Sequence, residues 1–261
     1  FVSIADAVTR SKCRSRPLAR WNLPLFGLVG AAARLSYRLA ATNAIVCMHA
    51  RLFGKARMST QSRLPANAED GVHYRPMEAR DLDQAWGLSL DQHWPHRPID
   101  WENALALGEG IVAECDGQVV GSALRWRWDA THATVGLIIV SEHMRGRRVG
   151  SALTSQLLDD LDGYTVSLHA TEEGRGLYER LGFVRTGEIR QHQGIASPAP
   201  LIALGDGWRL RPYDRSDDEA LFAFDTRARG WSRPSLLRMC LDPAESVMVL
   251  DHGGELSGYA V

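Results

Sequence analysis

Apolar and polar residues follow two different periods along the chain from Val72 onward. Short runs rich in β-branched and aromatic residues, typical of strands, alternate with longer stretches whose apolar residues recur every three or four positions, typical of helices. We predict strands over residues 72–75, 110–115, 118–126, 131–140, 164–169 and 183–189, and helices over 78–90, 100–107, 149–161 and 175–181. This order predicts an α/β domain over residues 71–197, in which helices flank a central mixed β-sheet.

Single residues support some of these elements. Asp116-Gly117 lies between two β-rich runs and predicts a tight hairpin. Asp100 is the expected N-cap of the second helix, and Gly182 is the expected residue just after the last helix. The run Leu137–Val140 is apolar throughout, which predicts a strand in the middle of the sheet.

Several motifs of this domain return later in the chain at an almost constant offset. The pairs are Tyr74-Arg75-Pro76 with Leu210-Arg211-Pro212, Trp94 with Trp231, Arg97-Pro98 with Arg233-Pro234, and the Asp116-Gly117 turn with Gly253-Gly254. The offset is 136 (210 minus 74) or 137 (231 minus 94) residues. Matches in the same order at a steady spacing indicate duplication. We therefore predict that residues 205–261 are the N-terminal half of a second, truncated copy.

Residues 1–70 differ in composition from the rest, because up to Arg57 the charged residues are almost all basic. We predict a poorly ordered leader and linker here, with Met58 as the true start. A transit peptide and a basic arm for nucleic acid are the alternatives. No apolar run is long enough for a transmembrane helix.

Global composition narrows the class of protein. The formal net charge of -1 gives no reason to expect nucleic acid or a membrane as the partner. The four cysteines are far apart and form no metal-binding motif, which favours reduced thiols in a cytoplasmic protein and no metal. Oligomeric state is open, with a homodimer as one possibility.

The stretch from Leu137 to Leu153 carries the clearest chemistry. An apolar strand leads through Arg145-Gly146-Arg147-Arg148-Val149-Gly150 into a helix. The first N–H groups of a helix have no intrahelical partner, and the helix dipole places partial positive charge there. Glycines permit close approach to the backbone, and arginines add positive charge. This combination predicts a phosphate site, although a basic surface turn followed by an ordinary helix would have the same sequence.

The turn and helix resemble the acetyl-CoA loop of the GNAT superfamily of N-acetyltransferases. Downstream, Gly176–Phe183 resembles the second signature of that family, a Leu-Tyr pair followed four residues later by Gly-Phe. The resemblance covers residues 72–194 and implies a GNAT-like fold that transfers an acetyl group from acetyl-CoA to an amine by direct attack. The second copy resembles the start of another such fold, as in tandem GNAT proteins.

The resemblance also implies roles for individual residues. Tyr178 would act as the general acid that protonates the CoA thiolate, because a phenol stays protonated at neutral pH. The implied acetyl-CoA-binding residues are Ile138, Ile139, Val140, Arg145, Gly146, Arg147, Arg148, Val149, Gly150, Ser151 and Thr171. Two positions depart from the family pattern: Arg148 replaces a usual glycine, and Thr171 replaces a frequent asparagine.

The general base and the acceptor site are less clear. No carboxylate lies between Thr134 and Val140, so His132 and His169 are the candidate bases, and a water relay is the alternative. The loop with Trp94, His96 and Arg97 is expected to line the acceptor site. The alternative function is a catalytically inactive GNAT-like module that binds CoA or acts as a sensor.

Overall fold

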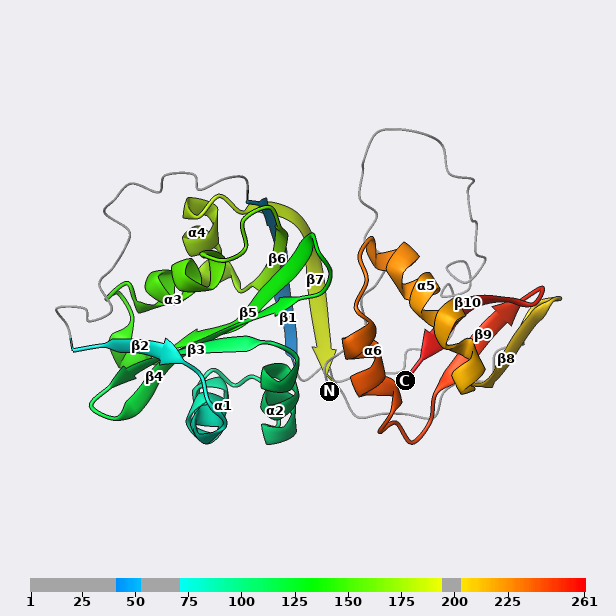
Figure 1. Cartoon of the computed structure of the whole chain (residues 1–261), viewed down its shortest axis with the longest axis horizontal. Coiled ribbons are helices and arrows are strands. Elements are labelled where there is room, and N and C mark those ends of the chain that lie inside the picture. Colours follow the sequence, from blue (N-terminus) through cyan, green and yellow to red (C-terminus); the bar gives the residue numbers. More distant parts are fainter. Residues whose placement is uncertain (1–40, 53–70, 194–202) are drawn as a thin grey trace.

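The computed structural model describes residues 41–52, 71–193 and 203–261, which form two units (Figure 1). The first unit contains a seven-stranded sheet in the order β2-β3-β4-β5-β6-β1-β7. Its strands are β1 (Ala41–Arg51), β2 (His73–Pro76), β3 (Glu109–Cys115), β4 (Gln118–Arg127), β5 (His132–Val140), β6 (Thr165–Ala170) and β7 (Val184–Gln193). Its helices are α1 (Leu82–Asp91), α2 (Pro98–Leu107), α3 (Val149–Leu158) and α4 (Glu172–Arg180).

The predicted α/β fold class and element order are confirmed over residues 73–193. At the β3–β4 hairpin, Asp116 and Gly117 have φ values of 51° and 76°, as a tight turn with two left-handed residues requires. The expected role of Asp100 as an N-cap is wrong. Arg97 is the N-cap of α2, and the Asp100 carboxylate accepts a hydrogen bond from the Arg97 N–H at 2.8 Å.

Strand β1 corrects the prediction for residues 1–70. Ala41–Arg51 pairs antiparallel with both β6 and β7 and so lies inside the sheet. Its side chains alternate: Val46 and Met48 are fully buried, whereas His49 and Arg51 are exposed. In the sequence, this alternation with a period of two residues lies among basic residues, which hid the pattern of a strand. The rest of the predicted leader and linker lies outside the described residues.

Helices cover both faces of the sheet (Figure 1). One cluster of buried residues joins α3 and α4 to the sheet and includes Val135, Leu153 and Tyr178. A second cluster joins α1 and α2 to the opposite face and includes Trp101 and Ile139. In the described ranges, no helix is long and apolar enough to span a membrane.

The element order of the second unit matches the order β2-α1-α2-β3-β4 of the first unit. Its elements are β8 (Trp208–Pro212), α5 (Asp218–Arg229), α6 (Pro234–Leu241), β9 (Met248–His252) and β10 (Glu255–Ala260), with sheet order β10-β9-β8. In the first unit, Arg75 donates to Asp81 and Glu114; in the second, Arg211 donates to Asp217 and Asp251. The same ion-pair geometry thus recurs at the motif that the sequence repeats.

The two units touch through the loop between α5 and α6. The Trp231 ring stacks on Trp128 with 5.7 Å between ring centroids, and on His132 with 6.3 Å. The Ser232 N–H donates to Asp129 at 3.4 Å. This contact lies at the turn that leads into β5, at the opposite end of that strand from residue 140.

Candidate functional site

Strand β5 carries an irregularity in its middle. Opposite it on β4, Ser122 pairs with Ile139 and Leu124 with Gly136, so the single residue between them on β4 faces two residues on β5. Leu137, at this bulge, has a φ of 49°. As a result, Val135 packs with the α3–α4 cluster whereas Ile139 packs with the α1–α2 cluster. In a regular strand two residues four apart would share one face.

The parallel strands β5 and β6 separate just where this bulge begins. They pair only over His132–Thr134 and Thr165–Ser167. Beyond Thr134, residues 135–140 of β5 pair with β4 alone. Backbone polar groups on the β6 side of this segment are therefore available to an extended ligand, which would lie between the strands as an added strand does.

The end of β5 leads directly to the N-terminus of α3. Its N-cap, Arg148, makes no side-chain capping hydrogen bond, and the first turn contains no acidic residue. The first helical bond runs from the Ala152 N–H to the Arg148 carbonyl. The N–H groups of Val149, Gly150 and Ser151 precede it and have no intrahelical acceptor. An uncapped, exposed helix N-terminus of this kind favours an anion.

The backbone explains why a glycine would suit position 148. Arg148 has φ 62° and ψ 11°, which is the left-handed region. A residue with a Cβ is strained there and glycine is not. Arg148 in place of the usual glycine therefore strains the backbone of the loop. The Arg148 side chain is exposed.

The other two arginines of the loop point toward specific neighbours. Arg145 donates to the Gln92 side chain at 2.6 Å, which joins the loop to the residue after α1. Arg147 lies 3.1 Å from the Met144 sulfur. Gln92 is a site residue that the sequence analysis missed, because no local pattern connects it with a loop more than 50 residues away.

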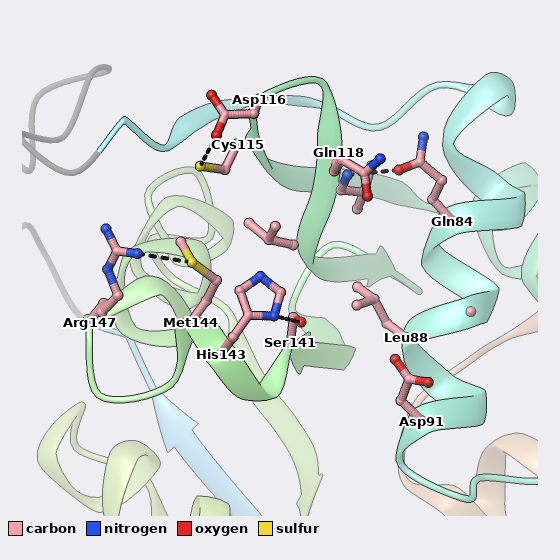
Figure 2. Close-up of a pocket in the computed structure, with 13 residues that line it drawn as sticks. Gln84, Leu88, Asp91, Cys115, Asp116, Gln118, Ser141, His143, Met144 and Arg147 are labelled. Carbon is pink, nitrogen blue, oxygen red and sulfur yellow. Dashed lines mark hydrogen bonds between the residues drawn. The ribbon is translucent and has the colours of Figure 1, made fainter.

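A cavity of about 610 Å³ adjoins this loop on the side of α1. Figure 2 shows Arg147, Met144 and His143 on one side of it, and Leu88 and Asp91 of α1 on the other. The β3–β4 hairpin forms the remaining wall. The cavity thus lies between the arginine loop and α1. Its wall contains both acidic residues, Asp91 and Asp116, and a basic residue, Arg147.

Tyr178 lies on α4, on the same face of the sheet as α3. Its side chain is buried, and its ring meets Phe183 edge-on at 6.1 Å. Burial raises the pKa of Tyr178 to about 12, so the phenol is fully protonated at neutral pH. No residue that the structure describes hydrogen-bonds to this hydroxyl.

The structure gives Thr171 a structural role. It is the N-cap of α4, and its hydroxyl oxygen accepts a hydrogen bond from the Gly174 N–H at 3.2 Å. A threonine in this position stabilises the first turn of a helix. Its expected contact with acetyl-CoA stays a prediction, in which the Thr171 hydroxyl would donate its proton to the ligand.

The two candidate bases lie in different surroundings. His132 lies below the separation of β5 and β6, with Nδ1 3.2 Å from the Asp129 carboxylate, and its ring stacks on Trp231. His169 is exposed on β6, opposite Cys47 of β1 and beyond the last β5–β6 pair. Of the two, His169 is the one beside the opening between the strands.

The loop between α1 and α2 brings together the residues expected to meet the acceptor. His96 lies edge-on to Trp94 and Trp101, with ring centroids 5.7 and 6.4 Å apart. The Arg97 guanidinium pairs with Asp100 at 2.7 Å. Burial opposes ionisation of Asp100, but the hydrogen bonds from Arg97 prevail and lower its pKa to about 2. Arg97 therefore stabilises the start of α2.

No group of three or more His, Cys, Asp or Glu side chains in the described part of the chain is arranged to hold a metal ion. Among the described residues, Cys47, Cys115 and Cys240 are not joined in disulfides.

Comparison with known proteins agrees with this geometry. The profile of the acetyltransferase (GNAT) domain matches residues 107–185. The uncharacterized N-acetyltransferase YitH of Bacillus subtilis (strain 168) is 28% identical over 130 residues, 49% of this chain and 45% of YitH. Protein ElaA of Escherichia coli (strain K12) is 27% identical over 112 residues, 41% of this chain and 73% of ElaA. The chain thus spans less than half the length of YitH.

A solved structure shows the same fold. An acetyltransferase candidate from Pyrococcus horikoshii aligns with a TM-score of 0.53 at 17% identity, over 69% of this chain and 64% of that one. The matched profile contains β5, the arginine loop, α3 and Tyr178. Residues 107–185 of this chain thus match the acetyltransferase (GNAT) domain family.

Proposed function

We propose that this domain is an acetyl-CoA-dependent N-acetyltransferase that transfers an acetyl group to a primary amine of a small molecule or a protein. One observation carries the proposal: the uncapped N-terminus of α3 follows directly on a strand that has separated from its parallel neighbour. The first feature suits a diphosphate, and the second suits an extended pantetheine arm. The two lie next to each other along the chain, as the two parts of CoA do.

Each part of the site would have its own task. The N–H groups of residues 149–151, with Arg145 and Arg147, would hold the diphosphate. Backbone groups of Ile138–Val140 would hold the pantetheine arm between β5 and β6. Bound acetyl-CoA supplies a thioester carbonyl, and the free amine attacks that carbon as the carbon–sulfur bond breaks. Holding the thioester and the amine in a fixed relative orientation would speed this transfer.

Tyr178 would act on the departing sulfur. Thiols have an ordinary pKa of about 8.5, whereas burial raises the pKa of Tyr178 to about 12. Complete proton transfer from this phenol to a thiolate is therefore uphill. We expect Tyr178 to donate a hydrogen bond that strengthens as negative charge develops on sulfur, with the proton shared in the transition state.

The alternative is a GNAT-like module that binds CoA without turnover. Arg148 favours it, because a strained residue stands in the loop where glycine would be relaxed. A further proposal concerns residues 205–261, which we take to be the first half of a second GNAT-like domain. The recurring Arg211 ion pairs and the order β8-α5-α6-β9-β10 support this.

Calorimetric titration of acetyl-CoA into the full chain tests the proposal. The variant Arg145→Ala/Arg147→Ala should weaken binding at least tenfold, since two charge-assisted contacts are lost. The control, Arg80→Ala/Arg215→Ala, removes two arginines whose side chains are 70% and 71% exposed in surface ion pairs away from the loop, and should bind as wild type does. Equal affinity for both double variants would refute the site. Binding without release of CoA in the presence of amines would favour the inactive module.

A further inference from the structure

Trp231 is the counterpart of Trp94 in the sequence repeat, but the two rings pack differently. Trp94 packs against the buried cluster of its own unit. Among the described residues, the buried cluster of the second unit, which includes Leu221 and Val249, does not contain Trp231. The Trp231 ring instead stacks on Trp128 of the first unit. An aromatic residue at the repeated position thus joins the two units rather than filling a core.

The loop that carries Trp231 is firmly held. Helix α5 ends at Gly230, whose left-handed φ of 86° turns the chain sharply. The Arg233 guanidinium donates two hydrogen bonds to the Asp225 carboxylate of α5, at 2.9 and 2.8 Å, and both side chains are buried. The Arg229 guanidinium lies 4.9 Å from the centre of the Trp231 ring. These contacts fix the direction in which the indole projects.

On the first unit, Trp128 connects this contact with the opening between β5 and β6. Its indole N–H donates a hydrogen bond to the Thr134 hydroxyl at 2.9 Å. Thr134 is the last residue of β5 that pairs with β6, where its partner is Ser167. This pair is the vertex of the opening, because the two strands separate beyond it. The Trp128 indole therefore holds the vertex and also stacks on Trp231.

The turn before the vertex is also in contact with the second unit. The Asp129 carboxylate accepts hydrogen bonds from the N–H groups of Thr131 and His132, at 2.7 and 2.8 Å. It also accepts one from the Ser232 N–H of the second unit, at 3.4 Å. The Thr131 carbonyl in turn accepts a hydrogen bond from the Thr165 N–H at 2.7 Å, where the β5–β6 pairing begins. Contacts from the second unit thus reach both ends of the short paired segment.

We propose that Trp231 is a positioning residue for the CoA site of the first unit: through Trp128 and Thr134 it holds the vertex and so sets the shape of the opening between β5 and β6. This rests on the proposed function, in which the pantetheine arm lies in that opening as an added strand. An added strand needs about 4.8 Å to each neighbouring strand. A shift of the vertex therefore changes the backbone bonds that the arm is able to make.

Hydrogen exchange of the full chain, followed by NMR, tests this positioning without any cofactor. Trp231→Ala should speed exchange about tenfold at the amides of residues 132–134 and 165–167, because the stacked partner of Trp128 is lost. Exchange in the β2–β3 pair should stay as in wild type, which shows that the first unit is folded. Unchanged exchange at residues 132–134 and 165–167 would overturn the proposal, whether or not the protein is an acetyltransferase.

Two further variants separate the contact from general effects of losing an indole. Trp231→Phe keeps an aromatic face for stacking and should restore most of the protection. Trp208→Ala is the matched control, since it removes a ring that stacks on His252 within the second unit, with 4.4 Å between ring centroids. It should leave exchange in the first unit unchanged. Equal acceleration in Trp208→Ala and Trp231→Ala would mean that the stacking on Trp128 is not the cause.

Calorimetry with two probes tests the consequence for the CoA site. Trp231→Ala should weaken the binding of acetyl-CoA about tenfold, whereas ADP, which has the diphosphate but no pantetheine arm, should bind within about twofold of wild type. Equal losses for both probes would overturn the proposal. Absence of acetyl-CoA binding in the wild-type protein would instead refute the proposed function, and the exchange experiment separates that outcome from a failure of the positioning contact.

A double-variant cycle tests the path through the vertex. Thr134→Val removes the hydroxyl to which Trp128 donates and should weaken acetyl-CoA binding about as much as Trp231→Ala does. Because both changes act through one contact, the double variant should bind about as weakly as the weaker single variant. Losses that simply multiply would show that Trp231 does not act through Thr134, and would overturn the proposal.

Discussion

The left-handed backbone of Arg148 leads to a prediction about stability. With φ 62° and ψ 11° at the N-cap of α3, this residue bears a strain that we place at about 1–2 kcal/mol for any side chain with a Cβ. Glycine removes the strain but adds about 0.4–1 kcal/mol of conformational entropy to the unfolded chain. We therefore expect Arg148→Gly to be more stable than Arg148→Ala by about 0.5–1 kcal/mol.

Comparison of these two variants isolates the backbone effect, since both lack the charge and only one lacks the Cβ. Urea denaturation and thermal melting give the difference, which corresponds to a shift in Tm of about 2–5 °C. Both variants should bind acetyl-CoA two- to fivefold more weakly than wild type, because an exposed charge is worth about 0.5–1 kcal/mol. If Arg148→Ala were as stable as Arg148→Gly, the left-handed assignment and the explanation of this departure from the family would both be wrong.

Two further predictions concern chemistry and folding. Tyr178→Phe should lower kcat about 10- to 100-fold, with unchanged affinity for acetyl-CoA, in an assay of thiol release; an equal rise in KM with constant kcat would contradict a role at the sulfur. Arg75→Met should destabilise the first unit by about 3 kcal/mol at pH 7, since it leaves the Asp81 carboxylate, 3% exposed, without its cation. The hydrogen bond from Arg75 is the main cause that lowers the pKa of Asp81 below 3.8 in the folded protein. The ion pair therefore stabilises the folded state above that pH, and this stabilisation is lost in more acidic solution, where Asp81 becomes protonated. The difference between wild type and Arg75→Met in urea denaturation should accordingly shrink below about pH 4, and a constant difference would contradict the assignment.

The alternating pattern of strand β1 is present in the sequence but too short to predict a strand. Val46, Met48 and Ala50 alternate with polar residues, yet this short segment lies in a region dominated by basic charge. An isolated alternation of this length has little predictive weight. Its meaning came from pairing with β6 and β7, which are more than 100 residues away in the chain.

The candidate site divides in the same way. The arginine loop, the N-terminus of α3 and Tyr178 follow from residues close together in sequence, and the structure puts the loop at the predicted end of β5. Local sequence did not predict the contact between Arg145 and Gln92 or the unpaired Nδ1 atom of His96, because each depends on how two separate elements pack.

By itself, the sequence determined the order of strands and helices over residues 73–193, the Asp116-Gly117 hairpin and the order of the motifs that match the GNAT profile. These depend on local period, local backbone preference and short spacings. Only the tertiary structure decided where β1 enters the sheet, where β5 leaves β6 after Thr134, and that His132 and His169 lie in unlike surroundings. The physical reason is that strand pairing and the packing of side chains join residues far apart in the chain, and no local pattern records which distant partner a residue will meet.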